Sequence, residues 1–203
     1  MRPPLPRLHA ITDERIARRA DLEQVALGLV IGGGTNIALH ARGRALAGRE
    51  HFELAERLTV DPSTRLFVND RLDIALALNA AGVQLGAGSL PVSAARRLDA
   101  TWWIGKSVHD VAEAEAAQAE GADYLLVGPV YATATHPGRA PMGLDILGRI
   151  ARLDLPVIAI GGIDSERARE VKAAGAYGVA AIRALWDAAD PADTARRMLE
   201  ELQ

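Results

Sequence analysis

Cysteine is absent from the 203-residue sequence, which excludes disulfide bonds, thiolate metal sites and catalysis by a cysteine nucleophile. Long apolar runs are absent as well, since no stretch approaches the roughly 20 residues that a membrane-spanning helix needs. The segment Met1–His9 carries arginine and three prolines but no apolar core, so we expect no secretory signal peptide. These absences predict a soluble protein of the cytoplasm.

Neither sign of charge dominates the chain. The net charge is −3, and the acidic and basic residues are interspersed, so there is no basic block for nucleic acid and no disordered acidic tail. Hydrophobic residues make up 49% of the chain, which is enough for a sizeable core. We therefore predict a single domain over residues 1–203 that binds neither nucleic acid nor a membrane.

Short apolar runs recur along the chain, and each is followed by a polar or glycine-rich turn and an Ala/Leu-rich amphipathic stretch. The predicted strands are Leu8–Ile11, Asn36–Ala41, Arg65–Val68, Gly82–Leu85, Trp102–Ser107, Tyr124–Val127, Pro156–Ile160 and Gly178–Ala181. The clearest predicted helices are Asp21–Ile31, Val111–Glu120 and Ser165–Ala174, the last with Ser165 as its N-cap and Gly175 as its stop. Alternating strands and helices predict a parallel sheet.

Eight such units in this length are close to the minimum for a (β/α)8 TIM barrel. The alternative is an open doubly wound sheet, which usually carries a glycine-rich phosphate loop after its first strand. Here that turn reads Thr12–Glu14 and contains no glycine. Polar residues and glycines instead follow nearly every predicted strand, which favours the barrel.

In a parallel barrel the loops that follow the strands form the active face. In this sequence those loops carry a ring of polar residues and glycines, whereas the opposite strand ends carry few residues with catalytic or binding side chains. The ring consists of Thr12, Asp13, His40, Arg42, Arg44, Asn69, Asp70, Ser107, His109, Thr133, Thr135, His136, Gly161, Gly162 and Arg183. This asymmetry predicts an enzyme.

Gly161 and Gly162 follow the seventh strand, where TIM barrels commonly bind phosphate together with the loop after strand eight. Glycines there let backbone N–H groups approach an anion, although a tight turn that needs glycine for its backbone alone is the plain alternative. His40, Arg42 and Arg44 alternate with period two, so all three are expected to face the barrel mouth and to suit a phosphate or carboxylate.

The alternative for Arg42 and Arg44 is a solvated loop in which they pair with Glu50 or Glu53. Asp70 could hold a metal, act as a base or cap the helix that begins near Arg71. The loop Gly86–Ser89 adds no second carboxylate for a magnesium–diphosphate site. The long segment Gly128–Gly143 is rich in glycine, proline and hydroxyls, which suits a loop that covers substrate.

Several short segments along the chain form a recognisable set: Asn69–Arg71 with Asp73–Ala75, Gly82–Gly86, Gly105–His109, Gly121–Tyr124, Gly128–Val130 with Thr133–Thr135, and Ile158–Ile163. In these segments, and over nearly its whole length, the chain resembles the thiamin phosphate synthase superfamily, whose fold is a (β/α)8 barrel. Two branches concern this chain. The synthases join an aminopyrimidine diphosphate to a thiazole phosphate with Mg²⁺ and release diphosphate, whereas the thiazole tautomerases isomerise a carboxythiazole phosphate.

Three departures from the synthase pattern favour the tautomerase branch. Synthases typically carry Gln at His40, a second Asp at Ser89 and Lys at His136, and the resemblance to the tautomerases extends to Leu8–Asp13 and His40–Arg44. One departure favours the synthases, because Pro129 stands where a tautomerase has its catalytic His. The resemblance therefore implies a thiazole tautomerase-like isomerase, with a synthase as the first alternative and a non-catalytic phosphate-binding regulator as the second.

In that interpretation no metal is required, whereas a synthase would need Mg²⁺ on Asp70. The acid–base residue is expected to be His136 or His40, because one proton moves and imidazole titrates near neutral pH. The residues expected to bind the thiazole phosphate are Arg42, Arg44, Asn69, Asp70, Ser107, Thr133, Thr135, Gly161, Gly162, Ala181 and Ile182. Of the other histidines, His9 is expected to pack inside strand one, His51 to face solvent and His109 to orient a loop. Self-association into a homo-oligomer is left open.

Overall fold

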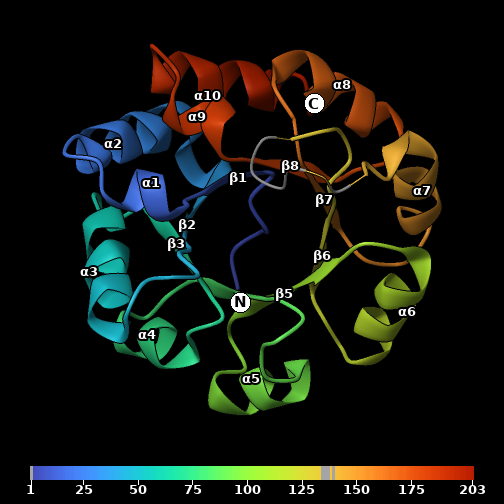
Figure 1. Ribbon diagram of the computed structural model, residues 1–203, viewed down its shortest axis with the longest axis horizontal. Helices are drawn as coiled ribbons and strands as arrows, with labels where there is room; N and C mark the ends of the chain where they lie inside the picture. The colour runs from blue at the N-terminus through green and yellow to red at the C-terminus, as the bar shows by residue number, and fades with distance from the viewer. Residues whose placement is uncertain (1, 134–137, 139) are drawn as a thin grey trace.

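A closed barrel of eight parallel strands forms the centre of the protein (Figure 1). The computed structural model describes residues 2–133, 138 and 140–203. The strands are β1 Leu8–Ile11, β2 Ile37–Ala41, β3 Arg65–Asn69, β4 Gly82–Leu85, β5 Trp103–Val108, β6 Tyr124–Val127, β7 Val157–Ile160 and β8 Gly178–Ala181. Each strand pairs in parallel with the next along the chain, and β1 pairs with β8 to close the ring. The predicted (β/α)8 barrel is confirmed.

Helices surround the barrel, at least one after each strand (Figure 1). They are α1 Glu14–Ala17, α2 Leu22–Gly33, the 3₁₀ helix η1 Gly34–Asn36, α3 Gly48–Leu58, α4 Leu72–Ala77, α5 Val92–Leu98, α6 Val111–Ala119, α7 Gly143–Ile150, α8 Ser165–Ala173, α9 Arg183–Trp186 and α10 Pro191–Glu200. The short helices α1 and α9 lie in the loops that follow β1 and β8. None of the helices in the described part of the chain is long and apolar enough to span a membrane.

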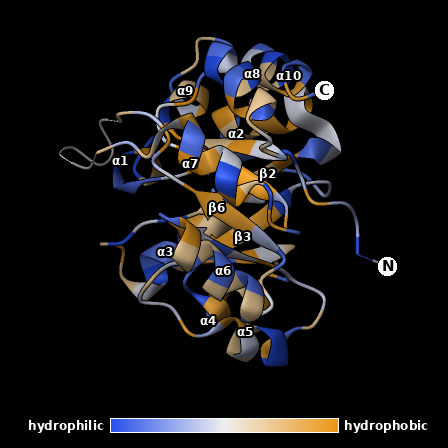
Figure 2. Cartoon of the chain, turned by 90° about the vertical axis from the view of Figure 1, so that its right-hand side faces the viewer, coloured by the Kyte–Doolittle hydropathy of each residue, from blue (hydrophilic) through white to orange (hydrophobic). Residues whose placement is uncertain are grey.

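Side chains alternate along the strands between two cores, as the two-residue period of a strand requires. In β3, Leu66 and Val68 pack in the outer core between strands and helices, whereas Phe67 packs inside the barrel. The barrel interior also holds Tyr124 and Ile158. Figure 2 shows this pattern from the side, with hydrophobic strands at the centre and hydrophilic residues on the outer helices.

Aspartates at the helix starts fix where several helices begin. The side chains of Asp110, Asp164 and Asp190 each accept a hydrogen bond from the backbone N–H three residues on, which satisfies one free donor of the first turn. The predicted N-cap Ser165 is therefore wrong by one residue, because Asp164 takes that role. Gly175 ends the same helix as predicted, and its φ of +103° is the left-handed conformation that favours glycine there.

The N-terminal segment lies across the end of the barrel where the strands begin. Leu5 is buried inside, and its carbonyl accepts a hydrogen bond from the Tyr177 hydroxyl at 2.7 Å. The Arg2 guanidinium stacks 3.6 Å from the ring centre of Trp103. This end is therefore filled by the protein's own chain, so the opposite end, where the strands finish, is the one open to a ligand.

Asp123 ties this segment to the barrel. Its carboxylate, with a side chain 15% exposed, accepts hydrogen bonds from Arg2 at 3.0 Å, from Arg96 at 2.7 Å and from the backbone N–H of Ile104 at 2.8 Å. Burial alone would raise the pKa of this carboxyl, but the hydrogen bonds from Arg2 and Arg96 outweigh it and hold the pKa below its ordinary value.

We predict that Asp123→Ala lowers the free energy of unfolding by about 2 kcal/mol at neutral pH, because two guanidiniums and one N–H lose their acceptor. A carboxyl whose folded pKa is depressed stabilises above its unfolded pKa and loses that contribution as the pH falls through the folded value. The difference between wild type and variant should therefore shrink below the ordinary pKa of 3.8. Urea unfolding from pH 7 to pH 2.5 measures it, with the exposed Glu115→Ala as control. Equal stability of the two variants at pH 7 would contradict the prediction.

Candidate active site

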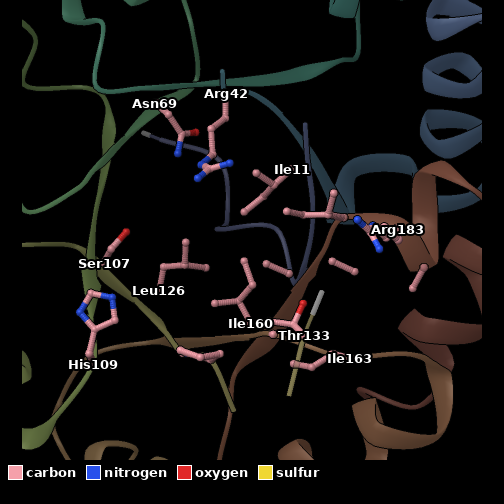
Figure 3. Close-up of a pocket in the computed structure, with 18 of the residues that line it drawn as sticks. Ile11, Arg42, Asn69, Ser107, His109, Leu126, Thr133, Ile160, Ile163 and Arg183 are labelled. Atoms are coloured by element: carbon pink, nitrogen blue, oxygen red, sulfur yellow. The ribbon is translucent and has the colours of Figure 1, made fainter. Parts of the chain in front are cut away.

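A pocket of about 520 Å³ opens at the carboxyl ends of the strands (Figure 3). The predicted site residues that line it are Arg42, Arg44, Asn69, Ser107, Thr133, Gly161, Gly162, Ala181 and Ile182, and His109 and Arg183 of the polar ring join them. Two predicted site residues do not line it: His40 lies inside the barrel, and Asp70 stands beside the pocket. Thr12 and Asp13 of the polar ring do not line it either. Thr135 and His136 lie outside the described residues.

The floor of the pocket is apolar, and sequence reasoning missed it. Ile11, Leu126, Ile160 and Ala180 line it, each at or near the end of a different strand. Figure 3 shows Ile11, Leu126 and Ile160 together in the middle of the pocket. The alternation of side chains along each strand could have predicted this floor, because all four residues belong to or border the set of side chains that face the barrel interior. Such a floor suits the flat face of a heterocycle.

The turn after β7 needs its glycines for the backbone itself. Gly161 has a φ of +105° and Gly162 a φ of +67°. A Cβ atom on Gly162 would lie 2.7 Å from the carbonyl oxygen of Ala132, and one on Gly161 would lie 2.7 Å from the Cα of Pro129. Both glycines therefore allow the β7 turn to pack against the loop after β6.

The same turn leaves backbone donors without partners. In the described part of the chain, the N–H groups of Gly162, Ile163, Arg183 and Ala184 have no acceptor, although all four residues line the pocket. Arg183 and Ala184 begin α9, the short helix after β8. Unpaired N–H groups from two adjacent loops form a set of donors suited to an anion.

The other side of the pocket is positively charged. Arg42 and Arg44 both line it, and burial, followed by the nearby charge of Arg44, lowers the pKa of the Arg42 guanidinium. The alternative pairing of these arginines with acidic residues of α3 is not found: Glu50 accepts from the backbone N–H of Ala47, and Glu53 pairs with Arg49 at 2.7 Å. A partly buried guanidinium, Arg42, and an exposed one, Arg44, are therefore available to an anionic group.

Asp70 stands at the rim beside these arginines. It has a φ of +64°, which is uncommon for a non-glycine residue. One oxygen, Oδ1, accepts from the backbone N–H of Gly86 at 3.0 Å and from the Ser89 hydroxyl, whereas Oδ2 has no hydrogen-bond partner in the described part of the chain. Asp70 does not cap α4, whose N-cap is Arg71 and has no side-chain cap. The carboxylate instead joins the β3 and β4 loops and keeps one oxygen available.

His40 is fully buried, one layer of side chains below the pocket. Its Nε2 lies 2.8 Å from Nδ1 of His9, and its Nδ1 lies 3.2 Å from Oδ1 of Asn69. The two-residue period of a strand correctly predicts that His40 and Arg42 face the same side of β2. The expectation that both reach the barrel mouth is wrong, however, because the His40 side chain is fully buried and does not line the pocket, whereas Arg42 does. Between His40 and the pocket stands Asn69.

The remaining described histidines divide between structure and site. His51 is buried, not solvent-facing as predicted, because its Nε2 donates to the carbonyl of Ala41 at 3.0 Å. His9 packs inside strand one as predicted. His109 lines the pocket, and its Nδ1 lies 2.8 Å from the Glu113 carboxylate, which fixes the ring at the start of α6.

Comparison with known proteins decides the family. The family model described as thiamine monophosphate synthase matches residues 8–185. The chain belongs to the thiamine monophosphate synthase family. It is 41% identical to the thiamine-phosphate synthase of Chloroflexus aurantiacus, over 97% of this chain and 92% of the relative. It is also 41% identical to that of Mycolicibacterium vanbaalenii, over 94% and 91%. The thiamine phosphate pyrophosphorylase structure from Pyrococcus furiosus superposes with a TM-score of 0.81 at 34% identity, covering 97% of this chain and 95% of that one.

The superfamily prediction is confirmed, but the assignment to the thiazole tautomerases is wrong. The similar curated proteins are synthases over nearly their full length. The departures that favoured the other branch say little about the ligand. His40 is buried below the pocket, so its identity reports packing inside the barrel rather than the molecule bound above it. Ser89 hydrogen-bonds to Asp70, and His136 lies outside the described residues.

We predict that Gly162→Ala lowers the free energy of unfolding by about 1–3 kcal/mol, because alanine resists a positive φ and its methyl group meets the Ala132 carbonyl. Gly88→Ala is the matched control on the same face, since a Cβ there meets nothing within 4 Å. Thermal unfolding of both variants checks the difference. If Gly162→Ala were as stable as Gly88→Ala, neither the positive φ nor the Ala132 contact would explain the glycine.

Proposed function

We propose that this protein is a thiamine-phosphate synthase, a transferase that joins an aminopyrimidine diphosphate to a thiazole phosphate and releases diphosphate. The curated relatives at 41% identity carry that name. The observation that carries the proposal is the layout of the pocket, in which two regions suited to anions flank an apolar floor (Figure 3). Two phosphorylated heterocycles need such a layout, with one region for each phosphate group.

In this proposal the thiazole phosphate binds the free N–H groups of Gly162, Ile163 and Ala184. These donors come from the loops after β7 and β8, the usual phosphate site of the TIM barrel. The diphosphate binds on the other side, against Arg42 and Arg44. Planar guanidiniums match phosphate oxygens with paired hydrogen bonds, and the partial burial of Arg42 strengthens its interaction with an anion.

The rings would lie between these regions, over the apolar floor. There the bond from the pyrimidine methylene carbon to the diphosphate oxygen breaks, and a bond from that carbon to the thiazole nitrogen forms. The leaving diphosphate gains negative charge as its bond breaks, so the arginines stabilise the transition state more than the ground state. The floor keeps water away from the reacting carbon.

Asp70 fits the magnesium ion that such a reaction uses. Mg²⁺ is typically held by one or two carboxylates together with substrate phosphates and waters. Asp70 offers one carboxylate with Oδ2 available, beside the arginine side of the pocket, whereas the described residues contain no cluster of three acidic or histidine side chains. When bound, Mg²⁺ would neutralise charge on the diphosphate. The Ser89 hydroxyl and the Gly86 N–H hold the carboxylate in place.

We predict that the purified protein forms thiamin phosphate from the two heterocycles when Mg²⁺ is present, and that EDTA abolishes product formation. Diphosphate release and chromatography of the product measure the reaction. Binding of thiazole phosphate without any turnover would instead indicate a non-catalytic regulator. A cytoplasmic location and homo-oligomer formation stay predictions.

We predict that Asp70→Asn lowers kcat by about 10²-fold or more at fixed Mg²⁺, because the amide keeps the contact to Gly86 but loses the charge that holds the cation. The exposed Asp145→Asn, which removes one carboxylate elsewhere, is the matched control. Titration of activity with Mg²⁺ distinguishes a weakened metal site from a misfolded protein. An Asp70→Asn variant with wild-type kcat and magnesium dependence would refute this assignment.

We predict that Arg42→Ala raises KM for the pyrimidine diphosphate at least about tenfold and leaves KM for the thiazole phosphate nearly unchanged, since only one of the two anion regions loses a guanidinium. The surface variant Arg49→Ala, which breaks the 2.7 Å pair with Glu53, is the control. Steady-state kinetics with each substrate varied in turn give both values. An equal rise in both KM values would contradict this division of the pocket.

A further inference from the structure

A row of polar groups runs from the pocket into the barrel interior. Oδ1 of the Asn69 side chain, which lines the pocket, lies 3.2 Å from Nδ1 of His40. Nε2 of His40 lies 2.8 Å from Nδ1 of His9, and Nε2 of His9 lies 3.0 Å from the carbonyl oxygen of Pro6. The row therefore contains three hydrogen bonds that link the ligand site to the N-terminal segment.

The Pro6 carbonyl at one end determines which ring nitrogen donates and which accepts in each hydrogen bond of the row. The Pro6 carbonyl can only accept, so Nε2 of His9 must carry a proton. In a neutral imidazole the other nitrogen is then an acceptor, so Nδ1 of His9 accepts from a proton on Nε2 of His40. Nδ1 of neutral His40 is likewise left without a proton. It needs a donor, and the group that faces it is the amide of Asn69.

Both imidazoles are neutral in this environment. Burial lowers the pKa of His9 to about 4, against the opposing hydrogen bond to Pro6, and burial followed by the proximity of His9 holds the pKa of His40 well below its usual value. No carboxylate in the described part of the chain hydrogen-bonds to either ring. Phe67 and Tyr124 pack against His9 instead. If an oxygen of Asn69 faced Nδ1 of His40, the three hydrogen bonds of the row would need three ring protons, and one of the two rings would carry a positive charge. No negative charge in this layer of the described residues would compensate that charge.

We propose that His9 and His40 are positioning residues that set the orientation of the Asn69 amide. This requires the amide to be turned by about 180°, so that its nitrogen takes the place of Oδ1 and donates to Nδ1 of His40. Its carbonyl oxygen is thereby presented to the pocket as a fixed hydrogen-bond acceptor. The assignment of nitrogen and oxygen in an amide follows from its hydrogen-bond network, and here the row of histidines supplies that network. Asn69 can then bind a donor group of a ligand.

A complementary donor lies on the same side of the pocket as this acceptor. Nε2 of Gln84 donates to the Ser107 hydroxyl oxygen at 3.0 Å, and the hydroxyl proton of Ser107 has no acceptor in the described part of the chain. Figure 3 shows Asn69 and Ser107 on the same side of the pocket. An acceptor and a donor on one side of the pocket suit the amino group and a ring nitrogen of one heterocycle. Resting on the proposed function, this assigns the pair to the amino edge of the aminopyrimidine.

The tautomers are tested on the unmodified protein by ¹⁵N labelling of the histidine rings and long-range ¹H–¹⁵N correlation at neutral pH. His51, whose Nε2 faces a carbonyl, provides an internal reference for a proton on Nε2, and His109, whose Nδ1 faces a carboxylate, provides one for a proton on Nδ1. His9 and His40 should both show a protonated Nε2 and a bare Nδ1. A protonated Nδ1 on His40, or an imidazolium at either position, would overturn the proposal.

Variants test the consequence for the ligand. His40→Leu should raise KM for the aminopyrimidine diphosphate about tenfold or more without changing KM for the thiazole phosphate, because Asn69 loses its orienting partner. His40→Gln should restore the lower KM, since one amide can accept from Asn69 and donate to His9. Equal KM values for wild type and His40→Leu, or a rise in both KM values that His40→Gln does not reverse, would contradict the positioning role.

A pyrimidine diphosphate that lacks the amino group separates this inference from the proposed function. Wild type should use it at least about tenfold less efficiently than the amino substrate, and His40→Leu should lose most of that preference. No preference in wild type would overturn the assignment of Asn69 to the amino group. If wild type formed no thiamin phosphate at all, the proposed function would fail, while the nitrogen spectra would still decide the orientation of Asn69.

Discussion

Closure of eight parallel strands into one ring is the constraint on which the rest of the structure depends. Parallel pairing of every neighbouring pair, from β1–β2 round to β1–β8, puts all eight carboxyl ends on one rim. Residues as distant in sequence as Ile11 and Ile182 therefore line one pocket. The other end of the barrel is filled by the N-terminal segment around Leu5, so a ligand has access from the rim alone.

Part of the interior of this barrel is polar. His9, His40 and Gln84 are fully buried, and each is linked by a hydrogen bond to a residue nearer one end of the barrel. Most buried polar groups in proteins have hydrogen-bond partners, so the hydrogen bonds in the layer beneath the pocket limit how Asn69 and Ser107 can be oriented. Specificity at the rim thus rests on side chains that the ligand never touches.

The positions of a few residues relative to the pocket explain why single sequence positions and the whole-chain comparison indicated different enzymes. Single positions such as His40 and Ser89 suggested a tautomerase, whereas the whole chain is similar to synthases. His40 is not in the pocket, and Ser89 supports Asp70 through a hydrogen bond. A substitution therefore indicates chemistry only once its distance from the ligand is known.

The sequence by itself determined the barrel, because strands buried on both faces read as continuous apolar runs. The ranges Leu8–Ile11 and Tyr124–Val127 were predicted to the residue, and the glycines after β7 were correctly placed at the rim. Depth within the barrel was decided by the tertiary structure alone. Period two tells which side of a strand a residue faces, but the stagger between neighbouring strands sets the layer that it joins. That stagger buries His40 and leaves Arg42, two residues later, in the pocket.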